Sequence, residues 1–301
     1  MTATSSAAAL VSAEVIEEEA RPPSAWRSVL GSTEGRIGLG ISLIVLFVIV
    51  FGRFFTPYPP NQIGVGPQTA NPTAAHLLGT DELGRDTLSR LLVGGTHIIL
   101  IPLIAVTLAW IFGGLLGMFG AYKGGRTDEL ITRAFDLLLS LPPLLIVLVA
   151  IAALGTSNVV LVLTIMFVYL PRMGRIVRGA TQAVVTSEYV ASAQARGERT
   201  SAILLREVLP NIISPTVADF ALRITYGVIF VATLNFLGLG VQPPRADWGV
   251  MVSEGRGFIN IDPVATLAPA AAIALLSIAL NLIADALTQH VTHGSKEIVP
   301  L

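Results

Sequence analysis

Six apolar stretches, separated by polar segments, dominate the hydrophobic pattern of this 301-residue chain. A helix of about 20 apolar residues crosses a hydrocarbon core of about 30 Å, and each stretch meets or approaches that length. Helices satisfy their own backbone groups in lipid, and the alternating pattern of a membrane barrel does not occur in the sequence. We therefore predict an all-α polytopic membrane protein with six transmembrane helices, at about residues 36–56, 94–121, 131–154, 159–178, 213–240 and 266–289.

Composition and charge support this class and predict an orientation. The chain is 53% hydrophobic and 13% charged, and its mean hydropathy of +0.73 lies outside the usual range of soluble domains. Thirteen of the 19 Lys and Arg residues fall on the same side of the predicted membrane as the N-terminus. Cytoplasmic loops carry the excess of basic residues, so both termini are predicted to lie in the cytoplasm of a multi-pass protein. The net charge of −1 is uninformative, and once these topology charges are assigned no basic patch remains for nucleic acid.

The domain organisation follows from the same pattern. Residues 1–35 are polar and acidic, lack the features of a cleaved signal, and are expected to form a disordered cytoplasmic leader. Residues 36–290 form the predicted transmembrane domain of six spans, and residues 291–301 a cytoplasmic tail. The longer connections between spans are an outer loop at 57–93, an inner loop at 179–212 and a second outer loop at 241–265.

Several kinds of chemistry are excluded or disfavoured. The sequence has no cysteine, and its four histidines do not cluster, so no metal site is expected. A phosphate-binding loop needs Gly-Lys-Ser/Thr, but the only lysines are Lys123 after Tyr122 and Lys296 after Ser295. If transport here uses ATP, the hydrolysis must take place on another chain.

A polar island at residues 188–210 lies between the fourth and fifth spans. Glu188 and Arg196 suit the two ends of a short helix, and Gly197 suits the left-handed position that follows it. Thr200 is expected to cap a second helix that ends before Pro210. A surface of small residues, Ala191, Ser192, Ala193 and Ala195, would allow close docking to a partner protein. A second interpretation is an amphipathic hairpin that lies on the membrane.

The first outer loop contains the sequence LGTDELGRD at residues 78–86. Thr80 is predicted to cap a short helix in which Asp81 and Glu82 complement the helix dipole. These carboxylates lack the ligand spacing of an EF-hand, so calcium is not expected. In the second outer loop, Trp248 is typical of a membrane interface.

Polar and small residues also occur within the predicted spans. Asp136 is expected to pair with Arg133, and Asp219 with Arg223, which favours architectural roles over substrate binding. Asp285 lies near the inner end of the last span.

Spans two to four carry three further signals. Gly113 and Gly117 fit the spacing of close helix packing, which favours a contact inside the bundle over a contact with another subunit. Pro142-Pro143 predicts a kink in the third span. Arg172, Arg175 and Arg178 form a basic stripe that we interpret as a topology anchor at the inner membrane surface.

Four of these features resemble one family, the C-type permease subunits of bacterial dipeptide and oligopeptide ABC importers. The inner loop of that family has a Glu-Ala-Ala cluster, a glycine and a closing Leu-Pro, which here read Ala191-Ser192-Ala193, Gly197 and Leu209-Pro210. The resemblance covers about residues 36–290. It also rests on LGTDELGRD with Ser89-Arg90, on the Arg-Asp-Ser-Leu-Pro series of the third span, and on FLGLGVQPP, WG and EGR after the fifth span.

The resemblance implies a non-catalytic subunit of the type I importer fold, in the bacterial inner membrane. It implies a homologous B-type permease as partner, two ATPase domains that hold ATP and magnesium, and an extracytoplasmic peptide-binding protein. The implied ATPase-coupling residues are Glu188, Tyr189, Ala191, Ser192, Ala193, Arg196, Gly197, Leu209 and Pro210, and the implied binding-protein contacts are Asp81, Glu82, Gly84, Arg85, Asp86 and Trp248.

The sequence departs from the family pattern at one coupling position and is compatible with more than one kind of transport protein. Ala191 occupies the position of the motif glutamate, and Glu188, one turn earlier, is a candidate replacement. A permease for nickel or another small solute shares much of this architecture. A secondary transporter and a purely structural membrane subunit also stay open at this point.

Overall fold

The computed structural model describes residues 29–296 as helices joined by loops, with no β-strand in that range. Two short pieces, η1 (Gly52–Phe54) and η3 (Arg256–Phe258), are 3-10 helices, and η2 (Leu204–Val208) is a π-helix. The α-helices are α3 (Thr33–Phe51), α4 (Thr87–Val93), α5 (Thr96–Lys123), α6 (Gly125–Ser140), α7 (Pro143–Leu154), α8 (Asn158–Val185), α9 (Glu188–Ala195), α10 (Thr200–Ile203), α11 (Leu209–Phe236), α12 (Trp248–Gly255) and α13 (Pro263–Lys296).

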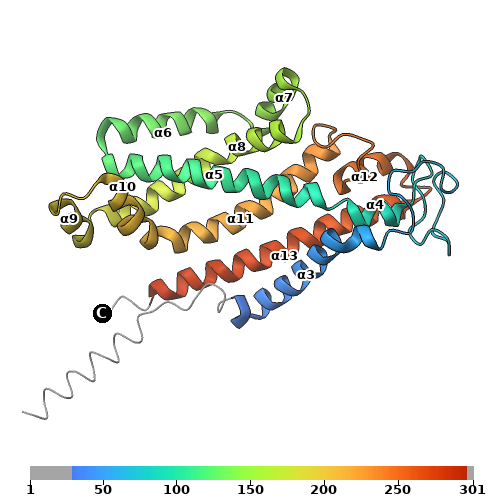
Figure 1. The fold of residues 1–301 in the computed structure, drawn as a ribbon, viewed down its shortest axis with the longest axis horizontal. Helices are drawn as coiled ribbons and strands as arrows, with labels where there is room; N and C mark the ends of the chain where they lie inside the picture. The colour runs from blue at the N-terminus through green and yellow to red at the C-terminus, as the bar shows by residue number, and fades with distance from the viewer. Residues whose placement is uncertain (1–28, 297–301) are drawn as a thin grey trace, which may run out of the picture.

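Six membrane crossings are consistent with this architecture. Within the described residues, five segments are long and apolar enough to cross a membrane, and the bent pair of α6 and α7 makes a sixth. Figure 1 shows the long helices side by side along the longest axis of the molecule, with α9 and α10 at one end and α4 and α12 at the other. The predicted fold class, an all-α polytopic membrane protein, is confirmed.

The third span is broken rather than kinked. α6 and α7 meet at an angle of 84°. Leu141 and Pro142, which join them, have extended ψ values of 131° and 130°. Each of these residues precedes a proline, whose ring disfavours the α conformation of its predecessor, so two consecutive residues leave the helix. The predicted kink is therefore an interruption, and the second proline starts α7 at a position where its missing N–H is tolerated.

The closest helix pair is α5 with α8, and glycines make this approach possible. A Cβ on Gly113 would overlap the carbonyl oxygen of Leu170, and one on Gly117 would overlap that of Gly174. On the α8 side, a Cβ on Gly174 would in turn overlap the ring of Phe135 from α6. The small-residue pattern thus packs helices of the same chain, as the sequence predicts.

Helix α3 lies against α13 and leaves most of its surface open (Figure 1). A Cβ on Gly38 would lie 2.8 Å from the carbonyl oxygen of Ala279, so this glycine sets the contact with α13. The far side of α3 exposes large apolar side chains, and Ile44 is 66% exposed. An apolar helix surface without protein cover is typical of a surface that faces lipid.

The two longest extensions beyond the predicted spans are at the ends of α8 and α13. α8 continues to Val185 and α13 to Lys296, so both run past the predicted inner ends at 178 and 289. Residues 1–28, most of the predicted leader, and residues 297–301 of the predicted tail lie outside the described residues.

Candidate functional site

The polar island forms a helical element at one end of the molecule. α9 ends at Ala195, and Gly197 follows with φ = 72°. The N–H of Gly197 donates to the carbonyl oxygen of Gln194 at 2.9 Å, and the N–H of Glu198 donates to that of Ala193 at 3.2 Å. This pair of hydrogen bonds is a Schellman motif, which requires a left-handed residue at the glycine. The predicted role of Gly197 at the end of the helix is confirmed.

One side of this element is anchored and the other is open. Val190 and Ala193 from α9 are buried together with Ile203, Val208, Met118 and Val177 in one apolar cluster. Such a cluster fixes the element near the C-terminal ends of α5 and α8 rather than leaving it free on a membrane surface. The open side carries most of the predicted coupling residues, namely Glu188, Tyr189, Ala191, Ser192, Arg196 and Gly197.

Two local predictions for this element are wrong. Arg199, not Thr200, is the N-cap of α10, and no side chain caps this helix. Pro210 does not end the second helix, because α10 continues through the π-helix into α11 without a break. The N–H of Leu209 donates to the carbonyl oxygen of Leu204, five residues back. Proline is tolerated in the first turn of α11, and the π segment lies directly before it.

At the opposite end of the molecule, residues 79–86 form a tight turn instead of the predicted helix. Gly79 and Gly84 have φ values of 73° and 68°, and a Cβ on either would overlap a backbone oxygen of the 57–86 loop. Asp81 accepts hydrogen bonds from the N–H groups of Leu83 at 2.9 Å and Arg85 at 3.0 Å. The side chain of Asp81 therefore organises the turn, and the helix begins later, at Thr87, with Asp86 as its N-cap.

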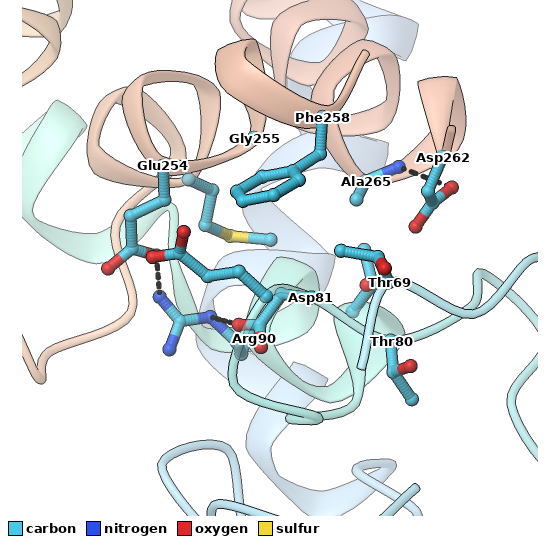
Figure 2. Close-up of a pocket in the computed structure, with 12 residues that line it drawn as sticks. Thr69, Thr80, Asp81, Arg90, Glu254, Gly255, Phe258, Asp262 and Ala265 are labelled. Atoms are coloured by element: carbon cyan, nitrogen blue, oxygen red, sulfur yellow. Dashed lines mark hydrogen bonds and ion pairs between the residues drawn. The ribbon is translucent and has the colours of Figure 1, made fainter. Parts of the chain in front are cut away.

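Two buried arginines hold this turn against α12. Arg85 and Arg90 are each 1% exposed. Both donate to Oε2 of Glu254, at 2.9 Å and 2.8 Å, and Arg85 also donates to Oδ2 of Asp81 at 2.6 Å. Figure 2 shows Arg90 between Glu254 from α12 and Asp81 from the outer loop. We call these four residues the outer charge cluster.

A small cavity adjoins the outer charge cluster (Figure 2). Its volume of about 20 Å³ is room for one water molecule. Within the part of the chain that the structure describes, Nη1 of Arg90, Oγ1 of Thr87 and Oδ2 of Asp262 have no hydrogen-bond partner. Burial raises the pKa of Glu254 above its ordinary value, although the guanidinium groups of Arg90 and Arg85 oppose this shift. The described residues contain no group of three or more histidine and acidic side chains placed to hold a metal ion.

Most of the other residues predicted to contact a binding protein are buried inside the protein. Asp86 bonds to His76 Nδ1 at 2.9 Å and accepts from the hydroxyl of Ser89 at 2.7 Å. Trp248 is buried, and its indole N–H donates to the carbonyl oxygen of Leu91 at 2.8 Å, so the predicted interface position of this residue is wrong. Gly84, Arg85 and Asp86 are also buried, whereas Asp81 and Glu82 are half-buried. Contact of this set with a binding protein stays a prediction.

Asp247 joins the end of α11 to the start of α12. Its Oδ1 accepts from the side-chain amide of Asn235 at 2.8 Å and caps α12 through the N–H of Gly249 at 2.9 Å. Burial raises the pKa of Asp247 to about 6, and the hydrogen bonds from Asn235, Gly249 and Val250 act in the opposite direction. The carboxyl group is thus held at the one place where the two helices meet.

Of the acidic residues within the spans, Asp219 has the partner predicted from the sequence and Asp136 has another one. Asp219 and Arg223 pair as predicted, with a distance of 3.0 Å between Oδ1 and Nη2. The predicted pairing of Asp136 with Arg133 is wrong: Arg133 pairs with Glu129 and Asp136 pairs with Arg175 of α8. Arg133 is four residues from Glu129 on one helix face, and α8 lies beside α6, so both pairings are geometrically favoured.

Two more of these side chains have partners that the sequence did not specify. Asp285 accepts from the side-chain amide of Asn281 at 3.1 Å. Arg178, which we interpreted from the sequence only as a topology anchor, donates to both carboxylate oxygens of Asp128 at 2.6 Å and 2.7 Å. This bidentate pair ties α8 to α6, so the basic stripe also stabilises the packing of the bundle.

Sequence reasoning missed Glu254 and Asp128. Glu254 lies 164 residues from Arg90 along the chain, and no local pattern connects the two. The first outer loop gave no signal of a distant partner, because its own acidic residues are numerous enough to pair with its arginines. Asp128 stands next to Glu129, and only the packing of α6 on α8 decides which of the two carboxylates meets Arg178.

A bundle of apolar helices, with a helical element packed on one end and a loop held by ion pairs at the other, defines a polytopic membrane protein. Residues 111–295 match the family described as binding-protein-dependent transport system inner membrane component, and the chain belongs to that family. It is therefore a membrane component of a transport system.

Several named transport proteins are similar to this chain over most of its length. A probable D,D-dipeptide transport system permease protein of Escherichia coli (strain K12) is 36% identical over 245 residues, which are 81% of this chain and 82% of the relative. A glutathione transport system permease protein of Pectobacterium atrosepticum is 33% identical over 87% of both chains. A di/tripeptide transport system permease protein of Pseudomonas aeruginosa is 34% identical over 87% of this chain and 88% of the relative.

Proposed function

We propose that this chain is one permease subunit of an ATP-driven importer and forms half of the path for dipeptides or oligopeptides. The observation that carries the proposal is the helical element at 188–210. It is anchored on the bundle by an apolar cluster, exposes small residues on its open side, and continues directly into α11. Membership of the family and the peptide-transport names of the relatives support this proposal over a nickel or other small-solute permease.

The chain acts without catalysis of its own in this proposal. Neither Lys123 nor Lys296 belongs to a phosphate-binding motif, so ATP and magnesium are held by partner ATPase domains. A homologous B-type permease completes the path, and an extracytoplasmic peptide-binding protein docks on the outer loops. The end of the bundle with α9 faces the cytoplasm of a bacterial inner membrane, and both termini lie on that side.

Transport follows from alternating access in this assembly. ATP binding closes the ATPase domains, the 188–210 element moves with them, and the paired permeases open toward the binding protein. A ligand can drive such a switch only through different affinities for the two states. The element therefore has to be rigid, and its Schellman motif and buried anchor provide that rigidity.

Glu188 supplies the acidic contact that the family motif places at Ala191. It lies on the first turn of α9, its side chain is exposed, and it is three residues before Ala191 on the same helix face. Glu188→Gln should weaken ATPase stimulation about 10-fold, whereas Glu198→Gln, which removes only the exposed pair with Arg196, should leave it unchanged. Equal behaviour of the two variants would assign the contact elsewhere.

Reconstitution tests the function directly. The chain is co-expressed with a B-type permease, ATPase subunits and a binding protein of the same transport system. The assembly is placed in liposomes and supplied with ATP outside and loaded binding protein inside, or the reverse. ATP-dependent movement of a radiolabelled dipeptide supports the proposal. Movement of nickel without the dipeptide would establish a nickel permease instead, and transport without ATP would indicate a secondary transporter.

A further inference from the structure

Two arginines lie inside neighbouring candidate spans, Asn158–Val185 and Thr216–Phe236. Arg172 is 14 residues from the start of α8 and 13 from its end, and Arg223 occupies the same position in α11. At 1.5 Å per residue, each lies about 20 Å from both ends of its helix. That the basic stripe marks the inner membrane surface stays a prediction, and α8 continues 13 residues beyond Arg172.

The two arginines belong to one polar cluster. The guanidinium of Arg172 lies over the ring of Tyr169, 6.0 Å from its centroid. Tyr169 also packs on α11, where its ring centroid lies 6.5 Å from that of Phe230, and the same helix carries Arg223 and Tyr226. Arg223 is paired with Asp219, but Arg172 has no carboxylate partner among the residues that the structure describes. The cluster therefore carries one uncompensated positive charge.

This cluster is open on one side. Tyr226 is 48% exposed, and the side chains of Arg172, Asp219 and Arg223 are partly exposed. Ionised groups within a span are disfavoured against hydrocarbon, and they almost always face the bundle interior or a water-filled cavity. The open side of α8 and α11 here therefore differs from the open side of α3, where apolar side chains such as Ile44 are exposed.

We propose that this face of α8 and α11 lines the translocation path and that Arg172, with Arg223 beside it, binds a carboxylate of the passing peptide. This inference rests on the proposed function. A guanidinium presents paired N–H donors that match a carboxylate, and Asp219 already neutralises Arg223, so the cluster complements one negative charge. The phenol of Tyr226 is a further donor on the same open face.

The first experiment tests whether the open face of α8 and α11 is accessible to water. The chain has no cysteine, so a single introduced thiol is the only one in this subunit. Tyr226→Cys and Ile44→Cys are each placed in the assembled, reconstituted importer, whose other subunits are also made cysteine-free, and treated with a charged, water-soluble methanethiosulfonate reagent. Tyr226→Cys should react at least 10-fold faster than Ile44→Cys, and dipeptide with ATP should slow it. Equal, slow reaction at both positions would overturn the proposal.

The second experiment tests the carboxylate contact. Arg172→Gln should lower peptide transported per ATP hydrolysed about 10-fold, and Arg172→Lys should restore most of it. ATPase stimulation by loaded binding protein reports intact folding and coupling in each variant. Arg175→Gln is the matched control, because Arg175 is exposed on the same helix and pairs with Asp136. Wild-type transport by Arg172→Gln would overturn the proposal.

The choice of peptide identifies the source of the carboxylate. An equal loss for a neutral dipeptide and for one with an acidic side chain assigns the contact to the terminal carboxylate. A loss confined to the acidic dipeptide assigns it to the side chain. If the unmodified importer moves no peptide at all, the proposed function fails, and that outcome is distinct from a functional importer in which Arg172→Gln is silent.

Discussion

Gly197 offers the sharpest test of the coupling element, because a change there alters only backbone conformation. Its φ of 72° is left-handed, and a Cβ at this position would meet nothing within 4 Å. Gly197→Ala therefore adds no steric overlap, and its penalty is the cost of a left-handed alanine, about 1–2 kcal/mol. Gly197→Pro cannot adopt this φ and also loses the hydrogen bond to Gln194, so its penalty is larger.

These penalties change the equilibrium between the turn that presents the docking surface and other conformations of the segment. A penalty of 1.4 kcal/mol is about a factor of ten in an equilibrium constant, so alanine should lower the equilibrium constant for the correctly formed turn by about 5–30-fold. Asparagine tolerates the left-handed region better and should lie between glycine and alanine. In proteoliposomes, ATPase stimulation by loaded binding protein should fall in the order Gly, Asn, Ala, Pro, while insertion into the membrane stays unchanged.

Gly40→Ala is the matched control. Gly40 is an exposed glycine inside α3, and a Cβ there also meets nothing within 4 Å, but its conformation is helical. Alanine should be neutral or slightly stabilising at such a position. Unchanged coupling in Gly197→Pro would refute the argument that the Schellman turn presents the docking surface, and equal losses in both alanine variants would refute its conformational basis.

Three further predictions concern stability, measured as Tm in detergent. Glu254→Gln removes the carboxylate that two buried arginines share and should lower the free energy of unfolding by about 3 kcal/mol. Glu129→Gln changes only an exposed pair and should cost less than about 0.5 kcal/mol. Similar losses of stability in the two variants would contradict the role of the outer charge cluster. Gly117→Ala should cost about 1–3 kcal/mol because its Cβ would overlap α8, and no loss relative to Gly40→Ala would show that the helices separate easily. Burial raises the pKa of Asp247 from 3.8 to about 6, so the folded state binds this proton more tightly than the unfolded state does. The free energy of unfolding should therefore fall by about 3 kcal/mol as the pH rises from about 4 to 6. Asp247→Asn should flatten this pH dependence, and an unchanged pH dependence in the variant would assign it to another group.

The sequence predicted those features that depend on neighbours along the chain. The six spans follow from apolar length, the left-handed position of Gly197 follows from its place after a short helix, and the pair of Asp219 with Arg223 follows from helical spacing. Gly113 and Gly117 were identified as packing residues because small side chains four apart form one helix surface.

Features that depend on which helices meet were not predictable in this way. Asp136 could pair either with Arg133 of its own helix or with Arg175 of α8, and the packing of α6 on α8 decides for Arg175. Arg85 and Arg90 find Glu254 only because the two outer loops pack together. Pro210 was misjudged for another reason: proline stops a helix from its interior but is tolerated in the first turn, and the sequence does not show where that turn begins.

The unbroken passage from the 188–210 element into α11 gives this subunit the properties of a lever. α11 has 28 residues and is about 42 Å long. A rigid rod of that length that tilts by about 10° at its inner end moves its outer end by about 7 Å. There Asn235 is bonded to Asp247, which starts α12, and α12 carries Glu254 into the outer charge cluster. In the proposed importer, a displacement applied at the α9 end of the bundle would therefore move the loops at the opposite end by several ångströms.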